Sequence, residues 1–235
     1  MKNISLIAFD FDGTMADTEE LTLPDFWAFL QEDYGITVTR EDWMANYHGK
    51  AGPSLLSELN AAYGTKLEWP SFVAARNKRL PRLFAAGVHL APGLTDVLEH
   101  LHNGKLTYCI CTNSQAARNV MALDGLRNIS EEMRTHLQNN CFSGVEEGRT
   151  AKPAPDVYND AAKHFGVSPA QSIAIEDTVA GLKAAIDAGF VALGYTGLSR
   201  TPEEDTELLA AAGAHAVFNH WDAFLPLLET LEDPS

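Results

Sequence analysis

Short apolar segments alternate with helical patterns along most of the chain, and this alternation limits the possible fold more than any other feature. The clearest case is SIAIED followed by TVAGLKAAIDAG, whose terminal Gly189 suits a helix C-cap. Strands that alternate with helices form mostly parallel sheets with helices on both faces. We therefore predict an α/β protein with at least five strands, at residues 4–9, 107–112, 172–177, 190–196 and 215–218.

Residues 15–90 interrupt this alternation. From Met15 to His89 the apolar residues recur three and four positions apart, Gly or Pro separates the segments, and no stretch has a convincing strand pattern. We therefore predict an all-helical domain at residues 15–90, inserted into a core domain made of residues 1–14 and 91–235.

Polar residues lie where the predicted strands end. Ligands of open α/β sheets bind at the carboxyl ends of the strands, because the loops converge there. The residues are Asp10 and Asp12 after the first strand, Thr112 and Asn113 after the second, Glu176 and Asp177 after the third, and Lys152 just before a later helix.

The carboxylates of this set predict a metal site. Several carboxylates cannot share a small space without a cation, because like charges drive protonation or repulsion. Oxygen donors without His or Cys suit a hard ion such as Mg²⁺. Such an ion would allow anionic Asp10 to approach an anionic phosphate, and Lys152 and Thr112 would stabilise the phosphoryl oxygens.

Asp12 lies two residues after Asp10, so both side chains can project toward the same site. Asp12 would protonate the leaving alkoxide and then take a proton from the water that attacks an aspartyl-phosphate on Asp10. Gly13 would permit the sharp turn, and Thr14 could hold Asp12 in place. The pattern predicts phosphoryl transfer to Asp10 with Asp12 as general acid/base.

Charge and hydropathy limit the partners. The net charge of −15 argues against nucleic acid, whose binding relies on clustered Lys and Arg, whereas a small phosphorylated substrate is compatible with local cations. No apolar run approaches the roughly 20 residues of a membrane span, and the first residues lack a secretory signal pattern. We expect a cytoplasmic protein without a membrane partner, with an open oligomeric state and with reduced thiols at Cys109, Cys111 and Cys141.

Four motifs resemble those of a known superfamily, in the same order. AFDFDGT resembles the first motif of the haloacid dehalogenase superfamily, DxDGT. The segments similar to its second, third and fourth motifs are TNS, AKPAPDVY and IEDTVAGLKAA. The resemblance covers nearly the whole chain and implies a Rossmann-like core. The helical insert stands where that superfamily places its C1 cap, so the chain looks like a subfamily I phosphatase, similar to the phosphoglycolate phosphatase and β-phosphoglucomutase relatives.

The resemblance also implies roles for single residues. Asp10 matches the nucleophile, and Asp12 matches the acid/base residue whose backbone carbonyl also binds metal. In the cap, His48-Gly49-Lys50 resembles a loop that reaches the substrate, while Arg76, Lys78 and Arg79 form either a solvated basic face or a contact to the cleft. The implied substrate-binding residues are Thr112, Asn113, Lys152 and Lys50, and the implied Mg²⁺ ligands are Asp10, Asp12, Glu176 and Asp177.

The predicted function is hydrolysis of a small phosphate monoester, either a sugar phosphate or a phosphorylated acid. The β-phosphoglucomutases carry a cap histidine about a dozen residues after the nucleophile, and this chain has Leu21, Thr22 and Leu23 there, which favours hydrolysis over phosphotransfer between sugars. Dehalogenases and phosphonate hydrolases of this superfamily lack the second aspartate of DxDGT. The presence of Asp12 therefore argues against both activities.

Three other interpretations weigh less. A receiver-type signalling domain has its acidic pair before the acceptor aspartate and is usually about 100–150 residues long in all, so a large insert would be unusual. A non-catalytic relative that binds a phospho-ligand stays open. Glu176 and Asp177 could also serve as an N-cap pair for the following helix.

Overall fold

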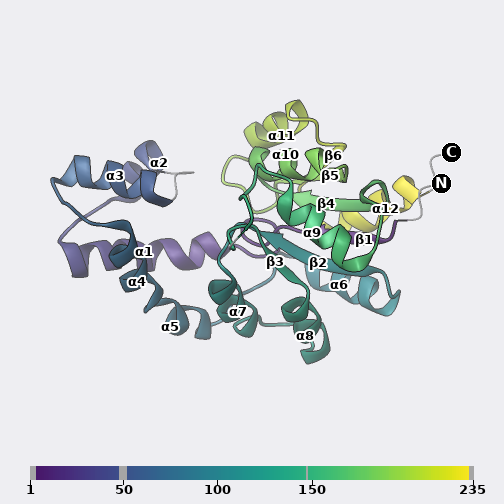
Figure 1. Cartoon of the computed structure of the whole chain (residues 1–235), viewed down its shortest axis with the longest axis horizontal. Coiled ribbons are helices and arrows are strands. Elements are labelled where there is room, and N and C mark those ends of the chain that lie inside the picture. Colours follow the sequence, from purple (N-terminus) through teal and green to yellow (C-terminus); the bar gives the residue numbers. More distant parts are fainter. Residues whose placement is uncertain (1–3, 48–51, 147, 233–235) are drawn as a thin grey trace. The chain divides into compact units, whose positions relative to one another are not determined.

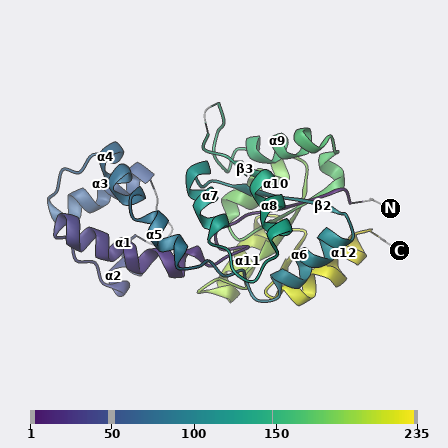
Figure 2. The ribbon, with the colours of Figure 1, turned by 90° about the horizontal axis from the view of Figure 1, so that it is seen from below.

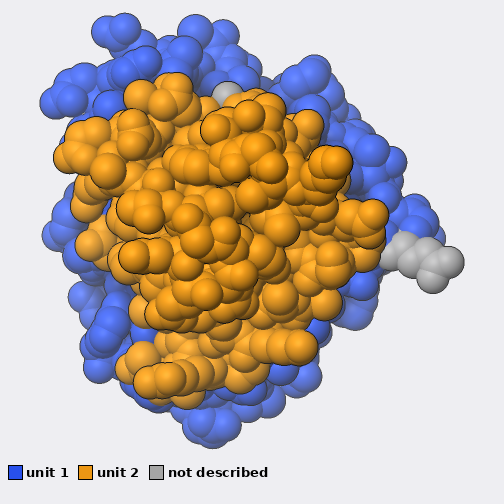
Figure 3. Space-filling model, turned by 90° about the vertical axis from the view of Figure 1, so that its left-hand side faces the viewer, with its two compact units in different colours: residues 1–18, 87–235 blue, residues 19–86 orange. Residues whose placement is uncertain are grey.

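The structure is a computed structural model that describes residues 4–47, 52–146 and 148–232. The chain divides into two compact units, which are coloured separately in Figure 3. Residues 1–18 and 87–235 form unit 1, and residues 19–86 form unit 2. Each unit has its own core of buried apolar side chains.

A six-stranded sheet lies at the centre of unit 1 (Figure 1). Its strand order is β3-β2-β1-β4-β5-β6, and every neighbouring pair is parallel. The mostly parallel α/β sheet expected from the sequence is therefore confirmed. The strands are β1 (Leu6–Phe9), β2 (Thr107–Thr112), β3 (Cys141–Ser143), β4 (Ser172–Glu176), β5 (Val191–Tyr195) and β6 (Ala216–Phe218).

Helices cover both faces of this sheet (Figures 1 and 2). All four residues of β1 are buried, which explains why this strand is a continuous apolar run rather than an alternating one. The helices are α6 (Leu94–Asn103), α7 (Ala116–Asp124), α8 (Glu131–Asn139), α9 (Asp156–Phe165), α10 (Val179–Asp187), α11 (Pro202–Ala211) and α12 (Phe224–Glu232), with short 3₁₀ turns at Pro169–Gln171 and Trp221–Ala223.

The side chains of β1 belong to two different cores. Leu6 and Ala8 belong to a cluster with residues of α9, α10 and α11. Phe9 points to the other face, where its ring centroid lies 5.7 Å from that of Trp221 and 6.5 Å from that of Phe224. Both faces of the central strand are thus covered, and the end of β1 is held firmly in the sheet.

The sequence did not predict β3 as a strand. It is only three residues long, lies at the edge of the sheet and pairs with β2 alone. Cys141 and Phe142 are partly exposed there. A strand so short and so incompletely buried leaves too little apolar pattern in the sequence to be recognised.

Unit 2 contains only helices among its described elements. Aromatic side chains from α1, α2 and α4 dominate its core, and Phe29 and Leu59 are fully buried within it. None of the helices in the described ranges of the whole chain is long and apolar enough to cross a bilayer. The helices of unit 2 are α1 (Thr18–Tyr34), which begins at the end of unit 1, α2 (Arg40–Asn46), α3 (Gly52–Tyr63), α4 (Trp69–Asn77) and α5 (Leu80–Ala85).

Two of the three basic residues predicted to form a solvated face or a cleft contact, Arg76 and Arg79, form ion pairs within unit 2. Arg76 Nη1 lies 3.2 Å from Asp25 Oδ2, and Arg79 Nε lies 3.1 Å from Asp25 Oδ1. Arg79 also pairs with Glu32 at 2.8 Å, and the two guanidinium groups lie over the rings of Phe26 and Phe29. These ion pairs tie the end of α4 and the start of α5 to α1.

The boundaries between the units differ from those expected from the sequence. Residues 15–18 and 87–90 belong to unit 1. These are the two segments that lead into and out of unit 2, and they pair with each other. The amide of Ala91 donates to the carbonyl of Met15 at 2.7 Å, and Ala16 forms an antiparallel bridge with Leu90. The sequence pattern could not show this pairing, since it joins residues far apart in the chain.

Replacing Leu6 by alanine should lower the free energy of unfolding by about 2–5 kcal/mol, because Leu6 is fully buried in the central strand and a cavity would remain. Val120→Ala on α7 is the control, since Val120 is 54% exposed and should change the free energy by less than about 0.5 kcal/mol. Urea denaturation followed by circular dichroism measures both. Equal losses for the two variants would contradict this core.

Candidate active site

Three neighbouring strands end at the same place in unit 1. In the strand order β2-β1-β4, Asp10 directly follows β1, while Thr112 and Glu176 are the last residues of β2 and β4. The amide of Asp10 donates to the carbonyl of Ile175 at 2.9 Å, so the ladder between β1 and β4 extends to Asp10 itself. The sheet thus fixes the backbone of Asp10.

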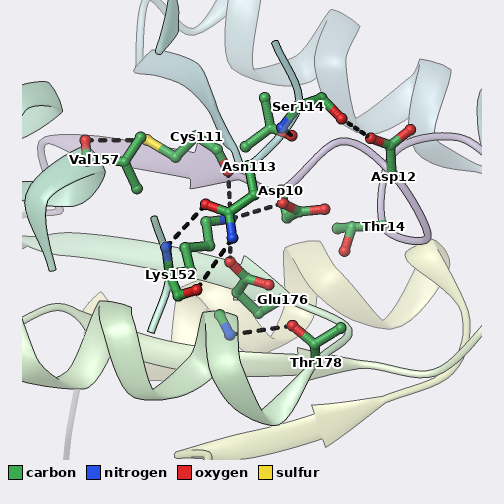
Figure 4. A network of polar contacts seen from close by, with 12 residues as sticks. Asp10, Asp12, Thr14, Cys111, Asn113, Ser114, Lys152, Val157, Glu176 and Thr178 are labelled. Atoms are coloured by element: carbon green, nitrogen blue, oxygen red, sulfur yellow. Dashed lines mark hydrogen bonds and ion pairs between the residues drawn. The ribbon is translucent and has the colours of Figure 1, made fainter. Parts of the chain in front are cut away.

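The ammonium group of Lys152 lies at the centre of the site (Figure 4). Its Nζ donates to Asp10 Oδ1 at 2.7 Å, to Glu176 Oε1 at 2.5 Å and to the carbonyl oxygen of Cys111 at 2.6 Å. The Lys152 side chain is only 4% exposed. Three acceptors satisfy the three N–H donors of the ammonium, which makes the buried charge tolerable.

Burial and charge shift the pKa values of this group in opposite ways. Burial by itself lowers the pKa of Lys152, but the charges and hydrogen bonds of Asp10 and Glu176 outweigh it and raise that pKa above its usual range. Burial raises the pKa of Asp10 to about 7, with Glu176 and Asp12 adding to the effect and Lys152 opposing it. Lys152 is therefore the permanent cation of the site.

Asn113 holds the backbone of Lys152. Its Oδ1 accepts from the Lys152 amide at 2.9 Å, and its Nδ2 donates to the Lys152 carbonyl at 3.2 Å (Figure 4). The side chain predicted to bind substrate therefore fixes the loop that carries Lys152. A direct contact between Asn113 and the substrate stays a prediction.

Glu176 is fully buried and joins two donors. The hydroxyl of Tyr158 and the ammonium of Lys152 both donate to its Oε1. Gly181 of α10 leaves room for the Glu176 carboxylate, because a Cβ at position 181 would come within 1.9 Å of Glu176 Oε2. The helix can approach β4 so closely only with glycine at this position.

An acidic group forms beside this network. Asp10, Glu176 and Asp177 can each offer a carboxylate oxygen such that the three atoms lie within 4.8 Å of one another. Burial, with the charges of Asp10 and Glu176, raises the pKa of Asp177 well above its usual range. The fit to a hard divalent ion is good, since three oxygen donors meet and their mutual repulsion calls for a further positive charge.

The turn after β1 brings Asp177 close. Gly13 has a φ of +85°, a conformation that other residues rarely adopt, and a Cβ there would lie 2.1 Å from Asp177 Oδ2. Thr14 faces the same carboxylate, with its hydroxyl 3.4 Å from Asp177 Oδ1. The sequence assigned Thr14 to Asp12, whereas a different threonine, Thr18, donates to Asp12.

Asp12 lies in a separate set of contacts. Arg118 binds it with two nitrogens, Nη1 to Oδ2 at 2.9 Å and Nη2 to Oδ1 at 2.8 Å. The hydroxyl of Ser114 donates to Oδ2 at 2.6 Å, and that of Thr18 donates to Oδ1. Burial alone would raise the pKa of Asp12, but the charge of Arg118 and these hydrogen bonds lower it below its ordinary value. The Asp12 carboxylate is not part of the acidic group described above.

The structure places the remaining predicted residues as follows. Thr112 is buried at the end of β2, where its Oγ1 accepts from the Ser114 amide at 3.0 Å. The N-cap of α10 is Thr178, whose hydroxyl accepts from the amide of Gly181, so the N-cap interpretation of the acidic pair is wrong. Lys50, with His48 and Gly49, lies outside the described residues.

Sequence reasoning missed four side chains that contact the site: Thr18, Ser114, Arg118 and Tyr158. Ser114 belongs to the TNS motif, and Arg118 follows it by four residues at the head of the predicted helix, a spacing that could have indicated a shared face. The contacts of Thr18 and Tyr158 have no comparable signal, because they depend on how distant segments meet.

A parallel sheet that gathers a lysine-bound aspartate and an acidic group at its carboxyl edge has the architecture of an enzyme site. The class follows from comparison with known families. Residues 4–189 match the haloacid dehalogenase-like hydrolase family. Because this match spans most of the chain, the chain belongs to that family and is a hydrolase, as the resemblance of its motifs predicted.

Relatives and solved structures agree with this class. Protein CbbY of Rhodobacter capsulatus is 29% identical over 204 residues, which cover 79% of this chain and 82% of that protein. The 6-phosphogluconate phosphatase of Escherichia coli K12 is 27% identical over 190 residues, covering 80% and 81%. A crystal structure of a CbbY mutant from Rhodobacter sphaeroides, in complex with xylulose-(1,5)bisphosphate, is 23% identical with a TM-score of 0.73, covers 93% of this chain and 95% of its own, and shows the same fold.

Lys152→Met should lower the free energy of unfolding by about 3–5 kcal/mol in the presence of EDTA, because it leaves buried Asp10 and Glu176 without their cation. Lys183→Met is the matched control. Lys183 is 60% exposed and pairs with Asp187 on the surface of α10, so its loss should change stability by less than about 0.5 kcal/mol. Denaturant titration at neutral pH compares the two, and similar values would refute the buried ion-pair network.

Proposed function

We propose that this hydrolase is a Mg²⁺-dependent phosphatase that cleaves a small phosphate monoester through an aspartyl-phosphate on Asp10. The observation that carries the proposal is the position of Asp10, which shares one cation with Glu176 and lies within the acidic group that includes Asp177. A nucleophilic carboxylate beside fixed positive charge is what an attack on an anionic phosphate requires.

The chemistry divides between the two aspartates of the first motif. Asp10 attacks phosphorus, the bond to the leaving oxygen breaks, and Asp12 donates a proton to that oxygen. Asp12 then takes a proton from water as the water oxygen attacks phosphorus, and the bond to Asp10 breaks to release phosphate. Lys152 and Thr112 stabilise the phosphoryl oxygens. When bound by Asp10, Glu176 and Asp177, Mg²⁺ supplies positive charge against the phosphate.

Two findings support a sugar phosphate or a phosphorylated acid as the substrate. One relative is named a 6-phosphogluconate phosphatase, and a structural neighbour is a complex with a sugar bisphosphate. Leu21, Thr22 and Leu23 stand where a mutase would have its cap histidine, which favours hydrolysis. We also propose that unit 2 is the cap, with Lys50 as a substrate contact, and that the enzyme works in the cytoplasm, where its free thiols would stay reduced.

Asp10→Asn should lower phosphate release by more than about 1,000-fold, because an amide does not form the acyl phosphate. Asp187→Asn changes the same chemical group on the surface of α10 and should keep the wild-type rate. A panel of phosphate monoesters assayed for released phosphate measures both and also identifies the substrate. If Asp10→Asn releases phosphate as fast as wild type, the proposed mechanism is wrong.

Removing divalent ions should reduce phosphate release to background, and adding Mg²⁺ should restore it. Binding alone should also stabilise the fold, by about 2.7 kcal/mol when Mg²⁺ is at 100 times its dissociation constant. Thermal denaturation with and without Mg²⁺ provides this readout independently of activity. Asp177→Asn should shrink the stabilisation, and an unchanged melting temperature in wild type would contradict the metal site.

A further inference from the structure

The hydroxyl of Tyr158 reaches the acidic group from within the core of unit 1. Tyr158 lies on α9, is fully buried and belongs to the apolar cluster that this helix shares with β1, β2 and α10. Its ring centroid lies 5.3 Å from that of Phe190. A phenylalanine of nearly the same volume would pack there as well, so packing accounts for the ring of Tyr158 but not for its hydroxyl.

The Tyr158 hydroxyl and the Lys152 ammonium converge on one oxygen of Glu176. Both donate to Oε1, the ammonium at 2.5 Å. A carboxylate oxygen has about two lone-pair sites, and two donors occupy both of them. The ammonium also carries a positive charge, which opposes the approach of a second cation to the same oxygen. A divalent ion held by Glu176 would therefore use its other oxygen, Oε2.

The two donors also set the orientation of the Glu176 carboxylate. The last torsion of a glutamate side chain has no sharp minimum, so hydrogen-bond partners decide how the carboxylate is turned. Lys152 divides its ammonium between Glu176, Asp10 and the carbonyl of Cys111. Tyr158 is a second anchor, and the packing of its ring within the core holds its hydroxyl in place.

The acidic group needs such an anchor. Asp10, Glu176 and Asp177 each offer one oxygen within 4.8 Å of the others, and Figure 4 shows the Glu176 side chain pointing toward Asp10 and Lys152. Carboxylates this close repel one another, which favours any rotation that separates them. The bonds to Oε1 oppose that rotation, so Glu176 stays in the group before an ion arrives.

We propose that Tyr158 is a positioning residue of the metal site, whose hydroxyl holds Glu176 so that Oε2 is available to a divalent ion together with Asp10 and Asp177. The proposal rests on the Mg²⁺ site of the function proposed above. Tyr158 acts through Glu176, in the way that groups behind metal ligands fix the orientation of those ligands. Its hydroxyl thus contributes to the affinity for Mg²⁺.

Tyr158→Phe removes the hydroxyl and keeps the ring, whose centroid lies 5.2 Å from the Lys152 ammonium. It should raise the dissociation constant for Mg²⁺ by about 10–100-fold, the usual effect of losing a group that orients a metal ligand. Isothermal titration calorimetry with MgCl₂ on the full chain measures this constant without substrate. Phosphate release should fall at low Mg²⁺ and return toward the wild-type rate at saturating Mg²⁺, because the proposed catalytic residues are unchanged.

Tyr108→Phe is the matched control. Tyr108 is 1% exposed on β2, and its hydroxyl lies 3.1 Å from His102 Nδ1, so the variant also loses a buried hydroxyl contact. A loss of stability is therefore expected of both variants. The dissociation constant for Mg²⁺ should change only in Tyr158→Phe, which separates a positioning role from a purely structural one.

If Tyr158→Phe binds Mg²⁺ as tightly as wild type, the hydroxyl only stabilises the fold and the proposal is overturned. Should this variant fail to fold, a crystal structure of wild type with MgCl₂ decides. The ion should then contact, directly or through water, the Glu176 oxygen that Tyr158 and Lys152 leave free. An ion on the oxygen that they hold, or one that avoids Glu176, overturns the proposal.

Two further outcomes concern the proposed function. A wild type that binds no Mg²⁺ overturns the metal site and the role of Tyr158 together. Phosphate release that survives Asp10→Asn refutes the proposed mechanism instead, while a weaker Mg²⁺ affinity in Tyr158→Phe would still support the positioning role.

Discussion

The buried ammonium of Lys152 is the interaction on which the site depends. It joins the ends of three strands at once, because its acceptors are Asp10 after β1, the carbonyl of Cys111 in β2 and Glu176 at the end of β4. Without this charge, two carboxylates would be buried close together, and their repulsion would favour protonation or displacement. The cation thus opposes the protonation that burial favours at Asp10 and holds its side chain in place.

The surrounding residues serve to hold that ammonium. Asn113 fixes the backbone of Lys152 with two hydrogen bonds, and the hydroxyl of Tyr158 donates to the same Glu176 oxygen as the ammonium. The absence of a side chain at Gly181 lets α10 approach Glu176. These contacts come from the residue after β2, from α9 and from α10, so the geometry of the site depends on how the helices pack on the sheet.

The sequence predicted the parts of the site that follow from local order along the chain. A strand end is visible in the sequence, and parallel strands bring their ends to one edge, so the meeting of Asp10 and Glu176 could be expected. Lys152 lies in a loop, and only the resemblance of AKPAPDVY to a family motif pointed to it. The boundary of unit 2 and the contact between Asp12 and Arg118 could not be predicted in this way. Both depend on contacts between segments that no periodicity links, such as the pairing of Ala16 with Leu90 and of Arg118 with Asp12.

Two aspartates two residues apart end up in opposite electrostatic environments. Burial raises the pKa of Asp10 to about 7 despite Lys152, whereas Arg118 and two hydroxyls overcome burial and lower the pKa of Asp12. Neighbouring carboxyl groups with separated pKa values are how an enzyme divides acid and nucleophile roles. Here the lowered pKa belongs to Asp12, the residue that we propose as the proton carrier. The proposed proton transfer therefore requires the surroundings of Asp12 to change, which includes its bidentate contact with Arg118.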